Sequence, residues 1–544
     1  MPRREAANAD RRAFLRQSGI LLAHACIAWP VGFFSQYDVR SYGAKGDGVS
    51  RDTWAIQAAI DAAAQVDGTV YFPPGKYVSG TLRLRDSVTV HLGAGATLVA
   101  SSADEDFDPP EPPSRDSFVD AETGDFRFAL LQGDGLSRVE IGGPGRIDGH
   151  RESRGGPKLI ALKRCRGVRI RDVTLLNAPN YNISLLDCAD VDIGRVTIRN
   201  GYSDGIDPDC CRQVRISDCH IETHDDAVAV KTSVALGARH ATEDVEVTRC
   251  NLSTMHNALK VGTESAGDCE RIVFSHCTIH GRPHPWTGQQ STGVSLMTVD
   301  GGSLRDVRVS DINMLNVRTP LFVRLGRRGN AKPEYESGTL SNVGISDLQI
   351  SGAMVASSIT GTPGHPVSGI SLAQIRVGVT GDSIVSSHFM ELFQRTLTGE
   401  FTRYQAPEDV PEQESSYPDA YMFRRLPAYG FYCRHVVDLT LDRIDLDIAQ
   451  PDKRSAVVLD DVKKATLQAM SASAPAGAAP LLFLRSVQGC RLDGVSPRAG
   501  ARTFLQLTGT DTTGVHLVGN DLSRVERVAI VDEQVAPGAL RMDR

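Results

Sequence analysis

The sequence lacks several features that mark particular classes of protein. No apolar run reaches the roughly 18 to 20 residues needed to cross a bilayer, so we expect no membrane insertion. The eleven cysteines are spaced neither like a zinc site nor like a small disulfide scaffold. These absences argue against a membrane-spanning protein, a zinc-held domain and a disulfide-stapled one.

A surplus of positive charge is also missing. The chain carries a net charge of −7 at pH 7, which argues against nucleic acid and anionic membranes as partners. An anionic substrate would therefore need a local basic patch. Hydrophobic residues make up 41% of the chain, enough for a large core, and this argues against global disorder.

The N-terminus differs in character from the rest of the chain. The run RRAFLR at residues 11–16 is followed by a modest apolar stretch, residues 18–29. Paired arginines ahead of such a stretch resemble a bacterial twin-arginine export signal, although a basic helix start is the alternative. We assign residues 1–30 to this signal and expect a periplasmic or secreted protein.

An internal repeat indicates the architecture. Segments that read apolar-x-apolar, then polar residues, then another apolar position recur at intervals of 23 to 36 residues. The clear copies begin at Val168, Val191, Val214, Val245, Ile272, Val307 and Val343, and weaker ones at Ile370, Leu439, Ala465, Cys490 and Val515. Short strands at this period predict an all-β, right-handed parallel β-helix whose coils pair about 4.8 Å apart. A β-propeller would need roughly 40 residues per repeat.

Other features fit one solenoid domain over residues 36–530. Residues 52–64 have helical spacing, with Trp54 among the apolar positions, and would cap the open first coil. Cys219, Cys250 and Cys277 each lie five residues after a coil start, which predicts a stack of interior thiols. Residues from about 380 to 432 interrupt the repeat and are interpreted as a loop insertion that could wall the cleft.

Several motifs then resemble known enzymes. The segments YDVRSYGAKGDG (37–48) and FPPGKY (72–77) resemble the opening of pectin-degrading β-helix enzymes. The segments YSDGID (202–207) and HDDAVAVK (224–231) resemble glycoside hydrolase family 28, the polygalacturonases. This resemblance covers roughly residues 36–350. It implies a hydrolase that cleaves an acidic, uronic-acid-containing, pectin-like polysaccharide or oligosaccharide by inversion, without a cofactor or metal.

The repeat itself brings carboxylates together. Aligning one strand across the coils gives a column two residues ahead of its first apolar position: Asn182, Asp204, Asp226, Asn257, Thr292 and Thr319. Asp204 and Asp226 therefore stack on adjacent coils, with Asp225 beside them. Three such carboxylates require at least one raised pKa. An aspartate ladder on turns or a calcium site is the alternative, and strict alternation requires a bend where Asp225 and Asp226 enter the strand.

The resemblance assigns roles to these residues, and it also shows departures. It implies that Asp225 is the general acid and that Asp204 and Asp226 position the water. The family's Gly-His-Gly histidine falls on Asn257, while His256, one residue earlier, either replaces it or is an ordinary surface histidine. The family's Arg-Ile-Lys, which holds a uronate, is Ser295-Leu296-Met297 here, and this makes plain polygalacturonan a doubtful substrate.

Other cations lie in neighbouring columns. Lys260 and Arg324 occupy the outward columns of Ser295 and Met297 one coil away, and Lys231 lies nearby. With Asn257 and Asp207, these three form the expected substrate-binding set. The alternative is that the cations pair with Asp207, Asp209 and Glu264 as a structural network.

Two other functions remain open on this scaffold. Asp207 and Asp209 would suit a calcium-dependent lyase or, more faintly, a C5-epimerase. A non-catalytic carbohydrate-binding β-helix would instead present aromatic platforms. Aromatic residues make up only 6% of the chain and do not cluster near the acids in the sequence.

Overall fold

The computed structural model describes residues 36–111, 126–284, 288–289, 291–328, 338–381, 406–423 and 425–543. The predicted export signal lies outside these residues, as does 382–405 within the predicted insertion. Among the described residues, no helix is long and apolar enough to cross a membrane.

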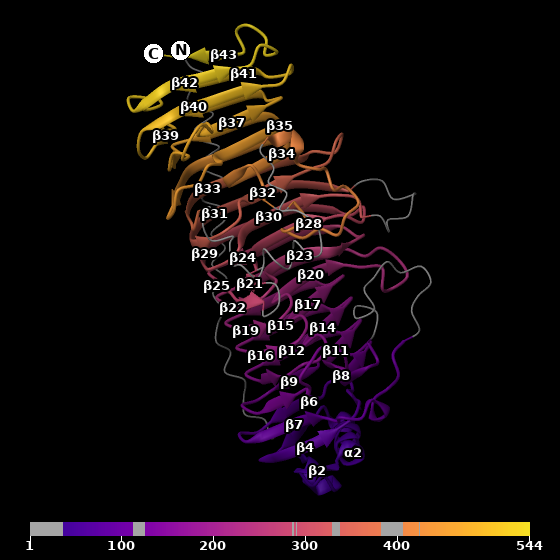
Figure 1. Cartoon of the computed structure of the whole chain (residues 1–544). Coiled ribbons are helices and arrows are strands. Elements are labelled where there is room, and N and C mark those ends of the chain that lie inside the picture. Colours follow the sequence, from indigo (N-terminus) through magenta and orange to yellow (C-terminus); the bar gives the residue numbers. More distant parts are fainter. Residues whose placement is uncertain are drawn as a thin grey trace, which may run out of the picture. The chain divides into compact units, whose positions relative to one another are not determined.

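The described residues form a right-handed parallel β-helix, as predicted, whose coils stack along one axis (Figure 1). Each coil contributes strands to up to three parallel sheets. The site sheet contains β5 (Leu82–Arg83), β8 (Ala129–Asp134), β11 (Lys158–Lys163), β14 (Ile183–Leu186), β17 (Ile206–Asp209), β20 (Val228–Thr232), β23 (Asn257–Ser265), β28 (Thr292–Thr298), β30 (Thr319–Leu325), β32 (Ser357–Thr360), β37 (Leu482–Arg485), β40 (Ala501–Thr508) and β42 (Val525–Val531).

Two further sheets complete the coils. The second contains β1 (Gln36–Asp38), β3 (Thr69–Phe72), β6 (Thr89–Leu92), β9 (Glu140–Gly142), β12 (Arg166–Arg171), β15 (Ala189–Gly194), β18 (Arg212–Ser217), β21 (Thr242–Thr248), β24 (Cys269–Ser275), β38 (Gln488–Asp493), β41 (Thr513–Val518) and β43 (Leu540–Met542). The third contains β2 (Asp47–Arg51), β4 (Gly75–Ser79), β7 (Ala96–Ala100), β10 (Arg146–Asp148), β13 (Thr174–Leu176), β16 (Thr197–Gly201), β19 (His220–Thr223), β22 (Asn251–Thr254), β25 (Thr278–Gly281), β36 (Ser471–Ala472) and β39 (Ser496–Pro497).

Longer strands run from one sheet into the next. They are β29 (Ser303–Leu315), β31 (Thr339–Ala353), β33 (Val367–Val379), β34 (Ala428–Ile448) and β35 (Ser455–Gln468). A short antiparallel pair, β26 (Pro283–His284) with β27 (Gly288–Gln289), lies outside the solenoid sheets. The chain forms parallel coil strands as far as Met542, beyond residue 530 where the sequence placed the end of the domain.

The predicted coil register is confirmed along the second sheet. Val168 pairs with Val191 and Val191 with Val214, and every later coil start pairs with the next, down to Cys490 with Val515. Since a slip of one residue would turn the apolar side chains outward, interior burial holds this register.

Each of these coils turns from the second sheet into the third at one left-handed residue. The residue four positions after the coil start has φ between 50° and 65° in all twelve: Asp172, Arg195, Asp218, Arg249, His276, Asp311, Asp347, Gln374, Arg443, Ala469, Gly494 and Gly519. Asp and His tolerate this conformation better than most side chains. Exposed ion pairs such as Arg195–Asp172, at 2.7 Å, link the turns of successive coils.

The capping helix and the cysteine stack form where the sequence placed them. Helix α2 (Thr53–Ala63) buries Ile56, Ala59, Ile60 and Ala63, but Trp54 is 88% exposed, so its predicted place on the apolar face was wrong. The described cysteines, Cys219, Cys250 and Cys277 among them, are all buried and free. Short 3-10 turns occur at Val39–Tyr42, Ala64–Val66, Asp104–Asp106 and Pro407–Asp409.

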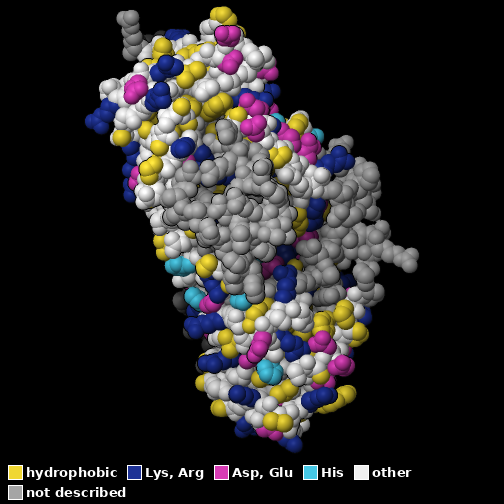
Figure 2. All heavy atoms as spheres, in the orientation of Figure 1, with side chains coloured by type: hydrophobic (Ala, Val, Ile, Leu, Met, Phe, Trp, Pro, Cys, Tyr) yellow, Lys and Arg dark blue, Asp and Glu magenta, His cyan; other side chains and the backbone are white. Residues whose placement is uncertain are grey.

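The interval between β33 and β34 contains residues 406–423, called the covering segment below. Its apolar side chains pack on the outer face of the site sheet: Val410, Ala420 and Phe423 lie against Met297 and Phe322. On the face shown in Figure 2, basic and acidic side chains are interspersed over the described surface.

Candidate active site

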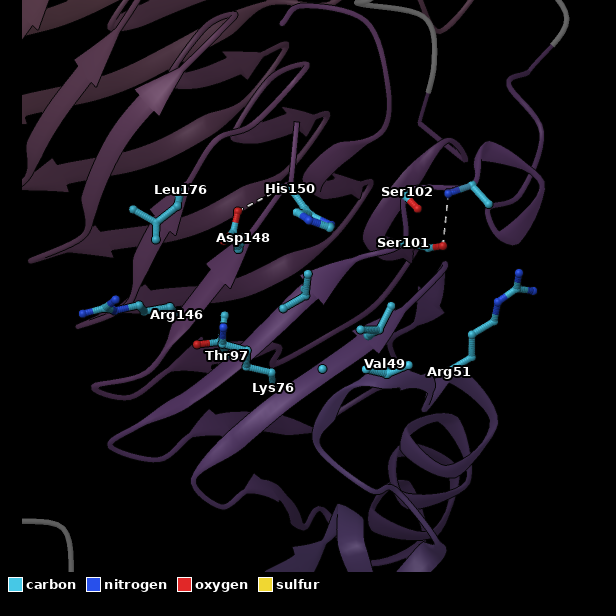
Figure 3. Close-up of a pocket in the computed structure, with 14 residues that line it drawn as sticks. Val49, Arg51, Lys76, Thr97, Ser101, Ser102, Arg146, Asp148, His150 and Leu176 are labelled. Carbon is cyan, nitrogen blue, oxygen red and sulfur yellow. Dashed lines mark hydrogen bonds between the residues drawn. The ribbon is translucent and has the colours of Figure 1, made fainter. Parts of the chain in front are cut away.

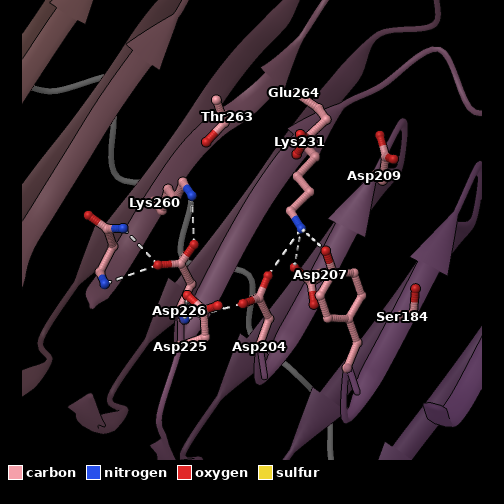
Figure 4. Close-up of polar contacts among 12 residues, drawn as sticks. Ser184, Asp204, Asp207, Asp209, Asp225, Asp226, Lys231, Lys260, Thr263 and Glu264 are labelled. Atoms are coloured by element: carbon pink, nitrogen blue, oxygen red, sulfur yellow. Dashed lines mark hydrogen bonds and ion pairs between the residues drawn. The ribbon is translucent and has the colours of Figure 1, made fainter. Parts of the chain in front are cut away.

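The three predicted aspartates meet at the corner where the third sheet passes into the site sheet. Asp204 precedes β17, and Asp225 and Asp226 precede β20 in the bend after β19. Ile206 pairs with Val228, which places Asp204 and Asp226 side by side on adjacent coils as the repeat predicted. One oxygen of each carboxylate lies within 4.8 Å of the others (Figure 4). The bend lets Asp225 and Asp226 share this corner.

Asp204 lies in a buried group of two acids and one cation. Lys231 Nζ lies 3.1 Å from Asp204 Oδ2 and 2.9 Å from Asp207 Oδ1, and donates to Tyr181 Oη at 3.0 Å. Burial, and then the charge of Asp207, raises the pKa of Asp204 well above its usual range. Burial likewise raises the pKa of Asp207. Two carboxyls sharing one ammonium in a dry site favour retention of a proton between them.

The pKa of Asp226 is shifted in the opposite direction to that of Asp204. Its Oδ2 accepts from Lys260 Nζ at 2.7 Å, and its Oδ1 accepts from Asn257 N at 3.0 Å and Asn257 Nδ2 at 2.7 Å. Burial alone would raise its pKa, but the charge and hydrogen bond of Lys260, with the other donors, lower the pKa of Asp226 to about 2. Asp226 is therefore an ionised carboxylate at neutral pH.

Asp225 is the most accessible of the three carboxylates. Its side chain is 22% exposed, whereas those of Asp204 and Asp226 are 6% and 4% exposed. Its Oδ1 accepts from Asp226 N at 3.0 Å, and Arg154 Nη1 lies 2.5 Å from its Oδ2. Arg154 comes from the loop between β10 and β11, a contact that the sequence reading did not anticipate. The charged, glycine-containing run HRESRGG (150–156) was the available signal.

Asn257 and His256 occupy different positions. Asn257 is buried, holds Asp226 through two donors, and accepts from Ser295 Oγ at 2.5 Å. His256 is half-buried one residue earlier, and its charge acts on Asp226. Ser295 therefore supports Asn257 from the position of the missing family arginine, while Met297 is buried under the covering segment.

The three cations expected to bind substrate are buried. Lys231 is 3% exposed, Lys260 6% and Arg324 1%. Arg324 lies beneath the covering segment, where Nη2 donates to the Glu412 carbonyl oxygen at 2.7 Å. The two lysines pair with Asp204, Asp207 and Asp226. Of the partners that the network alternative named, only Asp207 is among these, because Asp209 is held by Ser233 and Glu264 lies 3.7 Å from Arg328. In this arrangement none of the three presents a free charge to a ligand.

Asn182 and Asp209 lie outside the group of catalytic candidates. Ile183, and not Ser184, pairs with Ile206, so Asn182 was placed one residue out of its column. Asp209 lies apart from the acids in Figure 4 and is held by Ser233 N at 2.7 Å and by Ser233 Oγ. Asp209 is thus a buried structural acid on the far part of β17.

The covering segment adds residues to the corner that the sequence could not place there. Tyr417 Oη accepts from Thr263 Oγ1 at 3.0 Å, across 154 positions of sequence. Burial raises the pKa of Asp419 to about 6, against the lowering charges of His256 and Lys260. Burial and Asp419, and more weakly Asp225, raise the pKa of Tyr421. Exposed tyrosines therefore do lie near the acids, contrary to the impression from the sequence.

A separate cavity of about 450 Å³ lies on the third sheet near the N-terminal end of the solenoid (Figure 3). Its lining includes Lys76, Arg146, Asp148 and His150. Asp148 is the only carboxylate in that lining and accepts from His150 N at 2.9 Å. With one carboxylate this cavity lacks the pair of carboxyls that glycoside hydrolysis uses, so the three-aspartate corner is the better candidate for that chemistry.

Comparison with known proteins identifies the family. The Glycosyl hydrolases family 28 model matches residues 118–389, which contain all three aspartates. The chain belongs to glycosyl hydrolases family 28. A second model, rhamnogalacturonase A/epimerase, pectate lyase-like, matches residues 36–123 of this family 28 chain.

Individual relatives of this family 28 enzyme are distant. A probable polygalacturonase of Vitis vinifera is 26% identical over 368 residues, 62% of this chain and 73% of that protein. An endo-polygalacturonase of Pectobacterium carotovorum subsp. carotovorum is 23% identical over 296 residues, 49% of this chain and 70% of that protein. Mannuronan C5-epimerase AlgE6 of Azotobacter vinelandii is 51% identical over only 73 residues, 12% of this chain and 8% of the epimerase.

A solved structure agrees on the fold. The exopolygalacturonase of Thermotoga maritima superimposes with a TM-score of 0.55 at 19% identity, covering 63% of this chain and 87% of that one. The family 28 chain is therefore a glycoside hydrolase on a parallel β-helix.

Proposed function

We propose that this enzyme hydrolyses an acidic, uronate-containing, pectin-like polysaccharide or oligosaccharide through Asp204, Asp225 and Asp226. The observation that carries the proposal is the meeting of three carboxyls at one corner, where Asp225 is partly exposed and the two enclosed carboxyls have unequal charge states. The pKa of Asp226 is lowered to about 2, while that of Asp204 is raised well above its usual range. Glycoside hydrolysis needs one carboxyl that gives a proton and another that accepts one.

The exposure of the three carboxylates supports their individual roles. Asp225 can reach a substrate, so we assign it the general acid that protonates the leaving glycosidic oxygen. Arg154 must then release Asp225 Oδ2 when the sugar binds. Asp226, held ionised by Lys260, accepts the proton of the attacking water, and Asp204 helps to orient that water. His256 lies beside this group and is proposed to act with it.

Recognition of an acidic sugar is proposed to depend on Arg154. Its side chain is 50% exposed and adjoins the accessible acid, whereas Lys231, Lys260 and Arg324 are enclosed. A guanidinium can bind a carboxylate through two parallel hydrogen bonds. The relatives from Vitis vinifera and Pectobacterium carotovorum are named as polygalacturonases, which supports a uronate substrate.

Product analysis tests this function. The pure protein is incubated with a panel of acidic plant and bacterial glycans, and new reducing ends are expected without an unsaturated, ultraviolet-absorbing end. An unsaturated end would indicate a lyase. An altered C5 configuration without cleavage would indicate an epimerase, and an unchanged glycan would indicate a binding protein.

Proton NMR of the first product tests the mechanism. We expect inversion at the anomeric carbon. Inverting enzymes usually hold their carboxyls roughly 6.5 to 9.5 Å apart, and retaining enzymes about 5 to 5.5 Å. One oxygen of each of the three carboxylates lies within 4.8 Å of the others, closer than is usual in inverting enzymes. The anomeric configuration of the product therefore distinguishes inversion from retention. Retention would make one of the aspartates a nucleophile.

We also propose that the chain is exported through the twin-arginine route to the periplasm or beyond. The motif RRAFLR at residues 11–16 supports this location. Replacing Arg11 and Arg12 by lysine should leave the protein in the cytoplasm, as fractionation would show. Unchanged export would contradict the proposal.

A further inference from the structure

The outer face of the site sheet is covered on the C-terminal side of the acids. Met297 on β28 and Phe322 on β30 point outward and are 1% and 0% exposed. They are buried by Val410, Ala420 and Phe423 of the covering segment. Among the described residues, β28 and β30, the two site-sheet strands that follow the coil of Lys260, therefore offer no open strand surface on this face.

Polar contacts fix the covering segment in this position. Arg324 donates to the Glu412 carbonyl oxygen at 2.7 Å, and its guanidinium carbon lies 5.3 Å from the ring centre of Phe423. Arg327 N donates to the Glu414 carbonyl oxygen at 2.7 Å. The bond from Thr263 to Tyr417 brings the segment to the edge of the acid cluster. An apolar core with bonds at several points indicates a fixed wall.

The N-terminal side of the acids is covered too. Phe126 packs against Ala161 on β11, Leu186 on β14 and Cys210 after β17, and the chain at 235–236 joins this cluster. Lys158 is 0% exposed, with its ammonium 4.3 Å from the ring centre of Phe126. Two patches, the cluster around Phe126 and the covering segment over Met297 and Phe322, thus cover outward residues of the site sheet on the two sides of the aspartates.

What stays accessible is the corner itself. The side chains of Asp225 and Arg154 are 22% and 50% exposed, and the residues Tyr417 and Tyr421 are 51% and 45% exposed. Exposed tyrosines beside a reacting acid offer apolar ring faces and a hydroxyl to a sugar. The partly exposed groups at this corner are therefore Arg154, which contacts Asp225, and the tyrosines of the covering segment, which the bond from Thr263 to Tyr417 ties to β23.

We propose that the enzyme cleaves at chain ends, with Tyr417 and Tyr421 contacting the terminal sugars. This inference rests on the proposed hydrolysis of an acidic glycan. Internal cleavage of a chain lying along the sheet would need several sugars on either side of the scissile bond. Adjacent coils are about 4.8 Å apart, close to one sugar unit, so those sugars would lie over coils that the two patches cover. A chain end needs only the corner.

The test follows a pectin digest by viscosity and by reducing ends, together with size-defined oligogalacturonides labelled at the reducing end. Chain-end action predicts mono- or disaccharide from the first time point and a viscosity that falls slowly as reducing ends accumulate. Rapid loss of viscosity with fragments of many sizes would overturn chain-end action and leave the hydrolase standing. No reducing ends from any acidic glycan would instead remove the proposed function and this inference with it.

Variants of the exposed tyrosines test the contact. Tyr421→Ala is expected to lower kcat/KM on the labelled oligosaccharides about tenfold, since an aromatic contact is lost while the acids stay in place. Tyr417→Ala should act in the same direction. Tyr42→Ala, which removes a 37% exposed tyrosine from the 3-10 turn at Val39–Tyr42, is the matched control and should be silent. Wild-type kcat/KM for both site variants would overturn the assigned contact.

Discussion

Two adjacent coils place an aspartate beside a buried lysine, yet the two aspartates have opposite pKa shifts. The acids of the first coil, Asp204 and Asp207, share Lys231 of the next coil, and the pKa of both acids is raised, by burial in the first place. Asp226 on that next coil pairs with Lys260 of the coil after it and accepts two bonds from Asn257, and the pKa of Asp226 falls to about 2. Similar ion pairs thus give a proton-holding group and a fixed carboxylate.

The balance of charge at each carboxyl explains the difference. Burial disfavours every one of these carboxylates, but the charge and hydrogen bond of Lys260, with the other donors, outweigh it at Asp226, whereas Asp204 and Asp207 repel each other and share one lysine. A glycosidase can therefore obtain unequal carboxyls from three aspartates without a hydrophobic pocket around any single one. Asp225, between the two groups, has neither lysine and is the one a substrate reaches.

The largest expected effect is at this middle position. Asp225→Asn should lower kcat by around 10² to 10⁴ because an amide cannot donate the acidic proton. Its half-buried side chain makes few contacts, so the thermal midpoint should stay near wild type. Asp204→Asn and Asp226→Asn should also be severe, and double variants should cost less than the product of the singles because the three act as one unit. Near-normal turnover by Asp225→Asn on an ordinary glycoside would remove its role as the acid.

Replacing each lysine in turn tests the contrast between the Lys231 and Lys260 ion pairs. Lys260→Met leaves Asp226 buried without its cation and should cost about 3 to 5 kcal/mol of stability at pH 7. Lys231→Met should cost less, since Asp204 and Asp207 already have raised pKa values and take up a proton more readily. Thermal midpoints at pH 7 and pH 5 provide the measurement, and the loss in Lys231→Met should shrink more at pH 5. Equal losses at both pH values would show that the two coils do not differ as argued.

The accessible cation should matter only for charged substrates. Arg154→Met is expected to lower kcat/KM on an acidic oligosaccharide by about tenfold to a hundredfold and to have far less effect on a neutral analogue of the same linkage. Arg138→Met, at an exposed arginine paired with Asp67, is the matched control. If kcat/KM falls equally on the acidic and the neutral substrate, Arg154 acts through Asp225 and does not bind the carboxylate of the substrate.

A smaller effect concerns stability against pH. Because the folded pKa of Asp226 lies below its ordinary 3.8, its contribution is present above about pH 4 and is lost as pH falls toward 2. A shift of this size corresponds to about 2 kcal/mol. Asp204 and Asp207 have the opposite sign: their contribution is present below pH 3.8 and is lost as pH rises through their raised pKa values.

Unfolding midpoints from pH 2 to 8 would separate the two coils. Asp226→Asn should flatten the curve between pH 2 and 4, and Asp204→Asn should flatten it on the higher side of 3.8. The same flattening in both variants would mean that the carboxyls titrate as a single group.

The sequence predicted the coils well because burial acts on every coil in the same way. The apolar-x-apolar pattern placed the twelve coil starts from Val168 to Val515, and the stacked Asp204 and Asp226 followed from that register. The alignment was wrong at β14, where apolar residues allow two registers. The strand reads Ile-Ser-Leu-Leu, and the prediction aligned Ser184 with Ile206, whereas Ile183 pairs with it.

The site's partners were harder to predict. Which carboxylate each lysine contacts depends on the bend before β20, and a periodic pattern does not encode that bend. Arg154 comes from a loop 71 positions away from Asp225, and Tyr417 from 154 positions away from Thr263. Such contacts depend on where a non-repeating segment packs. The prediction of a wall from the insertion named the right region but none of these side chains.

The smallest expected effect is that of metal removal, for which we expect none. One oxygen from each of Asp204, Asp225 and Asp226 lies within 4.8 Å of the others, a spacing at which a cation could be bound. Ammonium groups already lie 3.1 Å from Asp204 and 2.7 Å from Asp226, and Arg154 lies 2.5 Å from Asp225. A divalent ion would have to displace these cations or be repelled by them, and hydrolysis by carboxyls needs no Lewis acid. Full activity after exhaustive chelation, with the same rate when calcium is restored, is the expected result. Strict calcium dependence would show that a metal ion, and not the lysines, neutralises the carboxylates at this corner. If the product also absorbed in the ultraviolet, the enzyme would be a lyase.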